Sequence, residues 1–285
     1  MSIITLTTDY GLKDHFVGSL KGKIISQLPD VKLIDISHDI DPFNIAQTSY
    51  IIESAYSSFP KGTVHLIGVD IEMNIENQHI VMLWNDHYFI AADNGILSLL
   101  TQKIIPQKIF AINIHDRLHV DARDLDVFVT VAAHLANGGL PNVIGKQITN
   151  LKELTQFQAT VENNFTIKGC VIYIDHFGNV VTNITKKMFL EFGQNRPYEI
   201  FFNSKSSSKP NSKKKKAIKT IYAKYSDIAS TNKFAISNYA GERVAIFNEA
   251  NYLELGLFRG NPNSLGSAAS MFGLSYRDTV EIIFN

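Results

Sequence analysis

The sequence predicts an α/β domain with a mainly parallel sheet at residues 1–155, followed by a smaller antiparallel β domain, a barrel or sandwich, at 156–285. Strand-like and helix-like segments alternate along residues 1–140, which is typical of a parallel sheet with helices on both faces. Beyond about residue 155 short strands dominate, which is typical of antiparallel β structure. The junction is expected between 140 and 165, where Pro141 and several polar residues occur.

Each element of the first domain is expected from its apolar pattern and from the residues that bound it. Pro29 ends the first helix, and Gly138 with Gly139 ends the last one. Asn85 and Asp86 join two apolar strands as a hairpin. In chain order we expect strand 3–8, helix 16–28, strand 32–36, helix 44–57, strand 63–69, the hairpin of 79–84 with 87–91, a short helix after residue 95, strand 109–114 and helix 126–137.

The second domain is expected to consist of short strands with a single helix. The predicted strands are 168–174, 180–184, 198–202, 219–223, 243–247, 252–258 and 279–284, and the helix is 185–192. The stretch 203–216 contains runs of serine and lysine, which indicates a solvated loop. A nucleic-acid-binding arm is the alternative, but no aromatic residue is interleaved there to stack on bases.

The composition argues against nucleic acid or a membrane as a partner. Lys and Arg together number 27, as do Asp and Glu, so the net charge is near zero. No apolar run reaches the roughly 20 residues of a transmembrane helix, and the chain begins on a strand-like run without a signal-peptide core. Cys170 is the only cysteine, so an internal disulfide is excluded. We therefore expect a cytoplasmic protein.

Four apolar, β-branched runs each end on an aspartate: Asp9, Asp70, Asp93 and Asp175. Parallel α/β sheets bind their ligands just beyond the carboxyl ends of their strands. A carboxylate there accepts two hydrogen bonds at once, which suits a vicinal diol such as a ribose. A single aspartate at such a position more often caps a helix or opens a turn. The recurrence favours a site for a polar small molecule.

The densest group of candidate ligand-binding residues lies at 175–184, where a strand ends on Asp175. Phe177 offers an aromatic face, Gly178 permits a tight turn, and Asn179 could read a base edge with one donor and one acceptor. The alternative is a hairpin turn in which Asn and Gly only satisfy the backbone. Taken alone, the pattern does not decide between the two.

Several common cofactor classes have no motif in this chain. A Walker-type phosphate loop, GxGxxG, HExxH and paired CxxC are all absent. None of the nine histidines has close metal-ligand spacing, so we predict no metal site. His38 follows the second strand and could orient a loop or line the cleft. A metal-dependent hydrolase is kept as a weaker alternative, for which metal removal is the test.

The motifs, taken together, resemble the S-adenosylmethionine hydrolase (adenosine-forming) family, the relatives of the fluorinating and chlorinating enzymes. The resemblance spans nearly the whole chain in the right order. It is carried by residues 7–11 (TTDYG), 20–22 (LKG), 35–38 (DISH), 60–65 (PKGTVH), 93–95 (DNG), 175–184 (DHFGNVVTNI) and 252–254 (YLE). It implies an α/β N-terminal domain, a β C-terminal domain and a homotrimer that binds S-adenosylmethionine between subunits.

The resemblance also implies a reaction and a set of roles. Water or hydroxide attacks the ribose 5′ carbon and expels methionine, and no cofactor is required. Asp9 would bind the ribose hydroxyls, Phe177 and Asn179 the adenine, and Asp175 the amino group of the methionine part. The matching motifs also make Tyr10, Asn94 and Glu254 candidate substrate-binding residues.

This chain departs from the family at the catalytic positions. The family uses an aspartate, an arginine and a histidine; the aspartate is Asp70, but Asn77 stands at the arginine position and Arg123 at the histidine position. We hypothesise that Arg123 reaches the pocket and pairs with Asp70, which is then the only general base. Residues 249–251 (EAN) replace a serine-containing turn that holds the methionine carboxylate, and the negative Glu249 would repel it. The alternative is therefore a non-catalytic or altered-specificity protein that binds an adenosyl compound or nucleoside.

Overall fold

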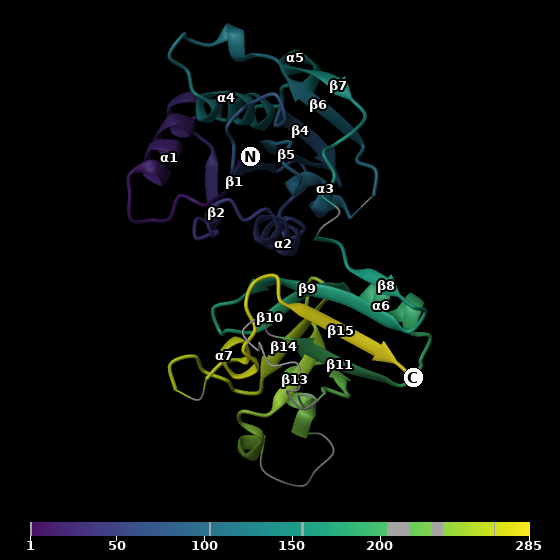
Figure 1. Cartoon of the computed structure of the whole chain (residues 1–285). Coiled ribbons are helices and arrows are strands. Elements are labelled where there is room, and N and C mark those ends of the chain that lie inside the picture. The colour runs from purple at the N-terminus through teal and green to yellow at the C-terminus, as the bar shows by residue number, and fades with distance from the viewer. Residues whose placement is uncertain (1, 103, 155–156, 204–216, 230–235, 265) are drawn as a thin grey trace. The chain divides into compact units, whose positions relative to one another are not determined.

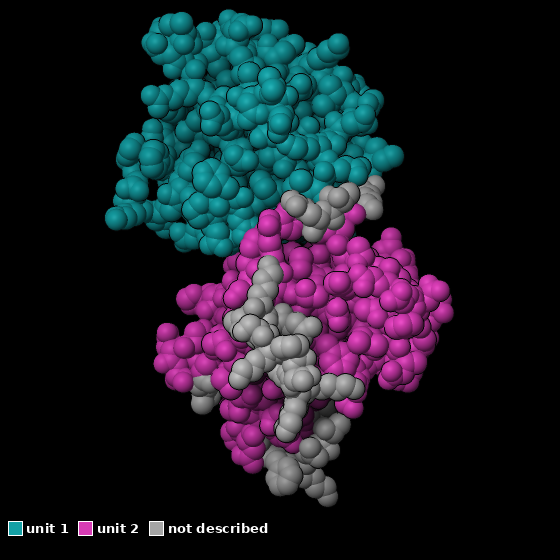
Figure 2. All heavy atoms as spheres, viewed as in Figure 1, with its two compact units in different colours: residues 1–154 teal, residues 155–285 magenta. Residues whose placement is uncertain are grey.

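The computed structural model describes residues 2–102, 104–154, 157–203, 217–229, 236–264 and 266–285. The chain folds into two compact units, residues 1–154 and 155–285 (Figure 2). The boundary predicted from the sequence was after residue 155. Apart from Asn203, the predicted solvated loop at 203–216 lies outside the described residues.

Unit 1 is built on one seven-stranded sheet with the strand order β2-β1-β3-β5-β4-β6-β7. The strands are β1 (Ile3–Thr8), β2 (Lys32–Ser37), β3 (Val64–Gly68), β4 (His79–Trp84), β5 (His87–Ala92), β6 (Lys108–Ile112) and β7 (Gly145–Ile148). The four strands from β2 to β5 in this order pair in parallel, whereas β5-β4-β6-β7 pair antiparallel. The sheet is therefore mixed, and the prediction of a mainly parallel sheet is only partly confirmed.

The hairpin is the physical reason for the mixed sheet. Asn85 and Asp86 both have positive φ, 49° and 63°, as a tight hairpin turn requires. This turn reverses the chain between β4 and β5, and β6 and β7 then continue the antiparallel side. The sequence predicted the hairpin itself, but it gave no sign of the short strand β7, in which two of the four residues are polar and exposed.

Helices cover both faces of the unit 1 sheet (Figure 1). On one face α1 (Phe16–Gln27) and α4 (Asp124–Ala136) pack against apolar side chains of β1, β3 and β5, such as Leu6, Leu66 and Ile90. On the other face α2 (Ile45–Tyr56) and α3 (Ile96–Thr101) pack against side chains such as Met82 and Phe89. Neighbouring residues in a strand point to opposite faces, so the fully buried strands supply both cores.

Two helices of unit 1 differ from the prediction. Helix α4 begins at Asp124, two residues earlier than expected, with Arg123 as its extended N-cap. Helix α5 (Pro141–Ile144) lies in the stretch predicted as the domain junction, and it leads directly into β7. None of the described helices combines the length and the hydropathy needed to cross a membrane.

Unit 2 is built on an eight-stranded sheet with the order β11-β15-β9-β10-β14-β13-β12, and β8 also pairs with β9. The strands are β8 (Thr160–Glu162), β9 (Thr166–Ile174), β10 (Val180–Thr185), β11 (Tyr198–Asn203), β12 (Ile221–Tyr222), β13 (Arg243–Phe247), β14 (Tyr252–Leu257) and β15 (Thr279–Phe284). In the described part of unit 2 all strand pairs are antiparallel except β12 with β13. Two helices, α6 (Lys186–Gly193) and α7 (Ala268–Phe272), accompany the sheet, and α7 was not predicted.

The unit 2 sheet is curled. An isolated bridge joins Ile200 of β11 to Ile218, three residues before β12 begins, so the two edge strands of the sheet lie near each other. The core inside includes Val171, Val180 and Leu255, all fully buried. The β character of this unit follows the prediction, as a partly curled sheet.

Candidate active site

The edge of the unit 1 sheet brings together three of the four strand-ending aspartates. Asp9 directly follows β1, Asp70 comes two residues after β3, and Asp93 directly follows β5. These three strands are adjacent and parallel, so their carboxyl ends lie at one edge. The fourth aspartate, Asp175, follows β9 in unit 2. A carboxylate-rich edge of this kind is a candidate binding site for a polar ligand.

Asp9 and Tyr10 form the first part of this edge. One carboxylate oxygen of Asp9 accepts a hydrogen bond from the backbone N–H of Phe43, with an N–O distance of 3.0 Å. The Tyr10 ring lies 5.8 Å from that of Phe16. Burial, together with the nearby Asp9 charge, raises the pKa of Tyr10 to about 12. The phenol therefore stays protonated at neutral pH and can donate a hydrogen bond.

His38 ties the ends of β1 and β2 together. Its Nδ1 lies 2.7 Å from the Thr8 hydroxyl, and its Nε2 lies 3.1 Å from an oxygen of Asp35. The imidazole is buried, at 4% exposure. His38 thus lies between the side chains of Thr8 and Asp35, close to Asp9.

Asp70 occupies a left-handed backbone position, with φ of 49°. Such a conformation is unfavourable for a residue with a side chain and persists only where the surroundings support it. Asn94 provides that support: its amide nitrogen donates to the carbonyls of Val69 and Asp70 at 3.2 and 3.1 Å. Its amide oxygen accepts from the backbone N–H of Ile96 at 3.3 Å. Asn94 was predicted to bind substrate, and the structure uses its side chain to hold Asp70.

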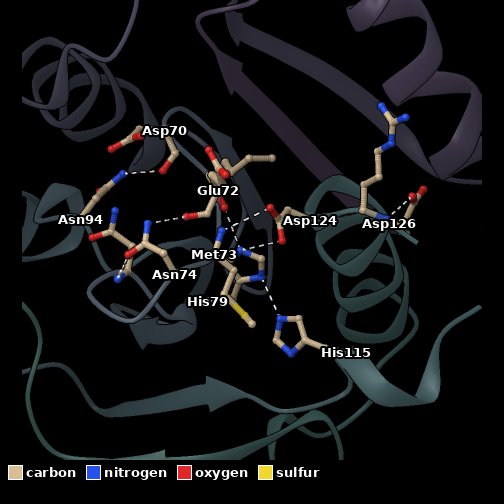
Figure 3. A network of polar contacts seen from close by, with 12 residues as sticks. Asp70, Glu72, Met73, Asn74, His79, Asn94, His115, Asp124 and Asp126 are labelled. Carbon is tan, nitrogen blue, oxygen red and sulfur yellow. Dashed lines mark hydrogen bonds and ion pairs between the residues drawn. The ribbon is translucent and has the colours of Figure 1, made fainter. Parts of the chain in front are cut away.

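Two side chains that were not predicted as site residues, His79 and Asp124, contact the loop from Asp70 to Asn77 (Figure 3). His79 Nε2 donates to the carbonyl of Ile71 at 2.8 Å, and Asp124 accepts from the backbone N–H of Met73 at 3.2 Å. His79 Nε2 and Asp124 Oδ1 lie 3.7 Å apart.

The same histidine contacts a second one. Since His79 Nε2 donates to a carbonyl, the neutral ring accepts at Nδ1, where His115 Nε2 lies at 3.0 Å. Burial lowers the pKa of His79, which favours this neutral form. A buried histidine at the start of a strand was the available sequence signal, but nothing in the sequence linked it to the loop.

Lys152 is a further site residue that the sequence analysis did not identify. Its ammonium donates to the side-chain oxygen of Asn77 at 3.0 Å, and its backbone N–H donates to Asp93 at 2.9 Å. Burial raises the pKa of Asp93, although the lysine charge and hydrogen bond act in the opposite direction. The structure therefore joins Asn77 to a cation.

Arg123 lies at the exposed N-cap of α4, where its backbone N–H donates to Asp126 at 2.9 Å. Among the described residues no ion pair joins Arg123 to Asp70. The predicted pairing of these two side chains thus has no support in the observed contacts.

In unit 2 the structure brings Asp175, Phe177 and Asn179 into one tight turn. The two carboxylate oxygens of Asp175 accept from the backbone and side-chain N–H groups of Asn179 at 2.8 and 2.9 Å. Gly178 has φ of 71°, and a Cβ there would lie 2.3 Å from that of Ser267. Phe177 is 63% exposed, so its ring is available for stacking. The turn is thus rigid in its backbone and presents an aromatic face.

Glu254 is only 8% exposed, and both of its carboxylate oxygens are engaged. The Tyr225 hydroxyl donates to one at 2.6 Å and the Asn248 amide donates to the other at 3.2 Å. Burial raises the pKa of Glu254, and the charge of Asp175 adds to the rise. Glu254 was predicted to bind substrate, and in this structure its carboxylate anchors β14 to Tyr225 and Asn248.

The α/β unit carries three carboxylates at one edge of its sheet, and the β unit carries an aromatic ring and an amide in the turn at 175–179. Such polar and aromatic groups are typical of enzymes that bind small molecules. The family model described as the SAM hydroxide adenosyltransferase N-terminal domain matches residues 4–145. The model of the C-terminal domain of the same family matches residues 169–281. The chain belongs to the SAM hydroxide adenosyltransferase family.

Individual relatives agree with this assignment. A protein named (R)-S-adenosyl-L-methionine hydrolase from Methanocaldococcus jannaschii is 29% identical, with 100% of this chain and 97% of that protein covered. A fluorinase from Actinopolyspora mzabensis is 26% identical, with 64% and 71% covered. The crystal structure of an uncharacterized conserved protein from Thermotoga maritima superimposes with a TM-score of 0.77 at 28% identity, covering 99% of both chains.

Proposed function

We propose that this protein hydrolyses S-adenosyl-L-methionine to adenosine and L-methionine. The observation that carries the proposal is the convergence of Asp9, Asp70 and Asp93 at one sheet edge, in a chain aligned over its full length with a protein named as such a hydrolase. A cytoplasmic setting, which the single cysteine suits, is part of the proposal.

The reaction is an in-line displacement at the ribose 5′ carbon. A water oxygen forms the new bond to this carbon while the carbon–sulfur bond breaks. The electron pair of the carbon–sulfur bond stays on the sulfur of methionine. Asp70, held by Asn94, accepts the proton of the attacking water. The sulfonium is already a good leaving group, so no metal or cofactor is required in this scheme. The protein contributes alignment, with about 3 Å between the reacting atoms, and a positioned nucleophile.

The substrate contacts are proposed from the matching motifs. Asp9 binds the ribose hydroxyls, with Tyr10 beside it as a neutral donor. Phe177 stacks on the adenine, and Asn179 reads its edge. Asp175 meets the amino group of the methionine part. In this proposal the chain forms a homotrimer in which these two sets of residues come from neighbouring subunits.

A non-catalytic or altered-specificity adenosyl-binding protein is the second candidate. The observations that favour it are the neutral Asn77 in the catalytic loop and the exposed Glu249 in the turn before β14. A ligand without a carboxylate, such as adenosine, would avoid repulsion from Glu249.

Incubation with S-adenosylmethionine followed by chromatography separates the two candidates. Release of adenosine and methionine above the rate without protein supports the hydrolase. Calorimetric titration with S-adenosylmethionine and with adenosine covers the alternative, because binding without product supports a binding protein. Absence of both product and binding refutes both. Light scattering of the same sample tests the homotrimer.

A further inference from the structure

We propose that Lys152 is the positioning cation of the hydrolytic site: it holds Asn77 and adds a positive charge to the sheet edge that carries Asp70. The inference rests on the proposed hydrolase function and deepens it. Lys152 lies after β7, outside every motif that carries the family resemblance. Its role therefore comes from the contacts alone.

The segment that carries Lys152 is fixed against unit 1 at three positions, 151, 152 and 154. Leu151 packs on the core beneath α2 and α3. The backbone N–H of Lys152 donates to Asp93 at 2.9 Å. Leu154 covers Gly95 so closely that a Cβ there would lie 2.3 Å from the leucine Cδ1. The lysine backbone is thus fastened to the turn that follows β5.

The side chain of Lys152 then reaches the catalytic loop. Its ammonium lies 3.0 Å from the side-chain oxygen of Asn77 and 4.0 Å from a carboxylate oxygen of Glu76. The lysine side chain is 37% exposed, whereas that of Glu76 is 78% exposed. A charge-assisted hydrogen bond to a neutral amide fixes the position of the ammonium without cancelling its charge. Asn77 therefore acts as a seat for the cation.

The local charge shows why a cation is needed there. The loop from Asp70 to Asn77 contains Asp70, Glu72 and Glu76 but no lysine or arginine. Asp93 adds a fourth carboxylate at the same edge. Conversion of water to a hydroxide-like nucleophile beside these anions is electrostatically unfavourable. A fixed ammonium offsets the developing negative charge, as preorganised cations do at other reacting oxygens.

The test compares four proteins: wild type, K152R, K152Q and K152M. Steady-state kinetics of adenosine release give kcat and KM, calorimetry gives the affinity for S-adenosylmethionine, and thermal melting monitors folding. K61M is the matched control, because Lys61 pairs with Asp86 at 2.7 Å before β3, at the opposite end of the strands.

We expect K152M and K152Q to lower kcat by about tenfold to a hundredfold, with the affinity for S-adenosylmethionine changed less than about threefold. K152R should recover most of kcat, because the guanidinium keeps the positive charge and can donate to Asn77. K61M should match the wild type.

Two outcomes overturn the inference. If K152Q recovers kcat as fully as K152R does, the hydrogen bond to Asn77 matters and the charge does not. If all Lys152 variants turn over like the wild type, the residue has no role in catalysis. Should K152M melt well below the wild type, the comparison rests on K152R and K152Q. Absence of adenosine with the wild type itself refutes the proposed function first, and the inference falls with it.

Discussion

The buried histidine pair in the sheet predicts that unit 1 loses stability in mild acid. His65 lies in β3 with 1% exposure. Its Nδ1 is 2.7 Å from the Thr5 hydroxyl, its Nε2 is 3.2 Å from His87 Nδ1, and its ring stacks on Phe89 at 4.8 Å. Burial, with a smaller contribution from His87, lowers the pKa of His65 from 6.5 to about 3.

The direction of the effect follows from linkage. Because the folded pKa is depressed, the imidazole is neutral in both states well above pH 6.5, and there it does not affect the free energy of unfolding. As the pH falls from 6.5 towards about 3, only the unfolded chain binds the proton, so stability is progressively lost. At pH 5 the protonated form of the unfolded imidazole exceeds the neutral form about thirtyfold, so the free energy of unfolding is about 2 kcal/mol lower than at pH 7.

The variant H65Q removes this titration while keeping groups that can hydrogen-bond to Thr5 and His87. Urea unfolding at pH 7, 6 and 5 can be followed by the fluorescence of Trp84, the only tryptophan in the chain, which lies in unit 1. The loss of unfolding free energy between pH 7 and 5 should be about 2 kcal/mol larger in the wild type than in H65Q. The control is H119Q, because the side chain of His119 is 80% exposed, and it should behave like the wild type.

The comparison uses the change with pH within each protein, so any constant cost of the substitution cancels. Equal losses in the wild type and H65Q would refute the reasoning. They would mean that the fold admits a proton at His65 without penalty.

Three further predictions concern the site. D70N should abolish adenosine release and leave the affinity for S-adenosylmethionine within about threefold, since Asp70 acts on the attacking water; turnover at the wild-type rate would remove Asp70 from the mechanism. F177A should weaken calorimetric binding of adenosine by about 1–3 kcal/mol through lost stacking, and unchanged affinity would contradict the role of Phe177. G95A should destabilise unit 1 in Trp84-monitored melting by about 1–3 kcal/mol, because φ is 103° and the new methyl meets Leu154, whereas G62A, with φ of 85° and no atom within 4 Å, should cost less.

Local signals in the sequence predicted most individual elements, because each has a marker within a few residues. The hairpin turn at Asn85 and Asp86 has both residues at positive φ. Strands β13 (Arg243–Phe247) and β15 (Thr279–Phe284) have the predicted bounds. Pairing between distant segments was harder to predict. Strand β7 has only four residues, and it joins the sheet through β6, about 35 positions earlier in the chain.

The site shows the same division. The convergence of Asp9, Asp70 and Asp93 follows from a topological rule about parallel strands, which the sequence was sufficient to apply. The seat of Lys152 on Asn77 joins residues 75 positions apart, and that of Asp124 under Met73 joins residues 51 apart. Such contacts depend on loop geometry that no local pattern encodes.

These long-range contacts explain how a polar loop keeps a defined shape. Within it Ile71 packs against the core, but Met73 is 46% exposed and Ile75 is fully exposed, so beyond Ile71 apolar burial contributes little to its position. Hydrogen bonds hold the rest of it: Asn94 and His79 donate near its start, and Lys152 donates to Asn77 at its end. Each of these ties depends on the donor side chain itself. Polar contacts from three separate segments therefore hold the loop that begins at Asp70, and substitution of any one donor should affect the geometry of the loop more than the stability of the fold.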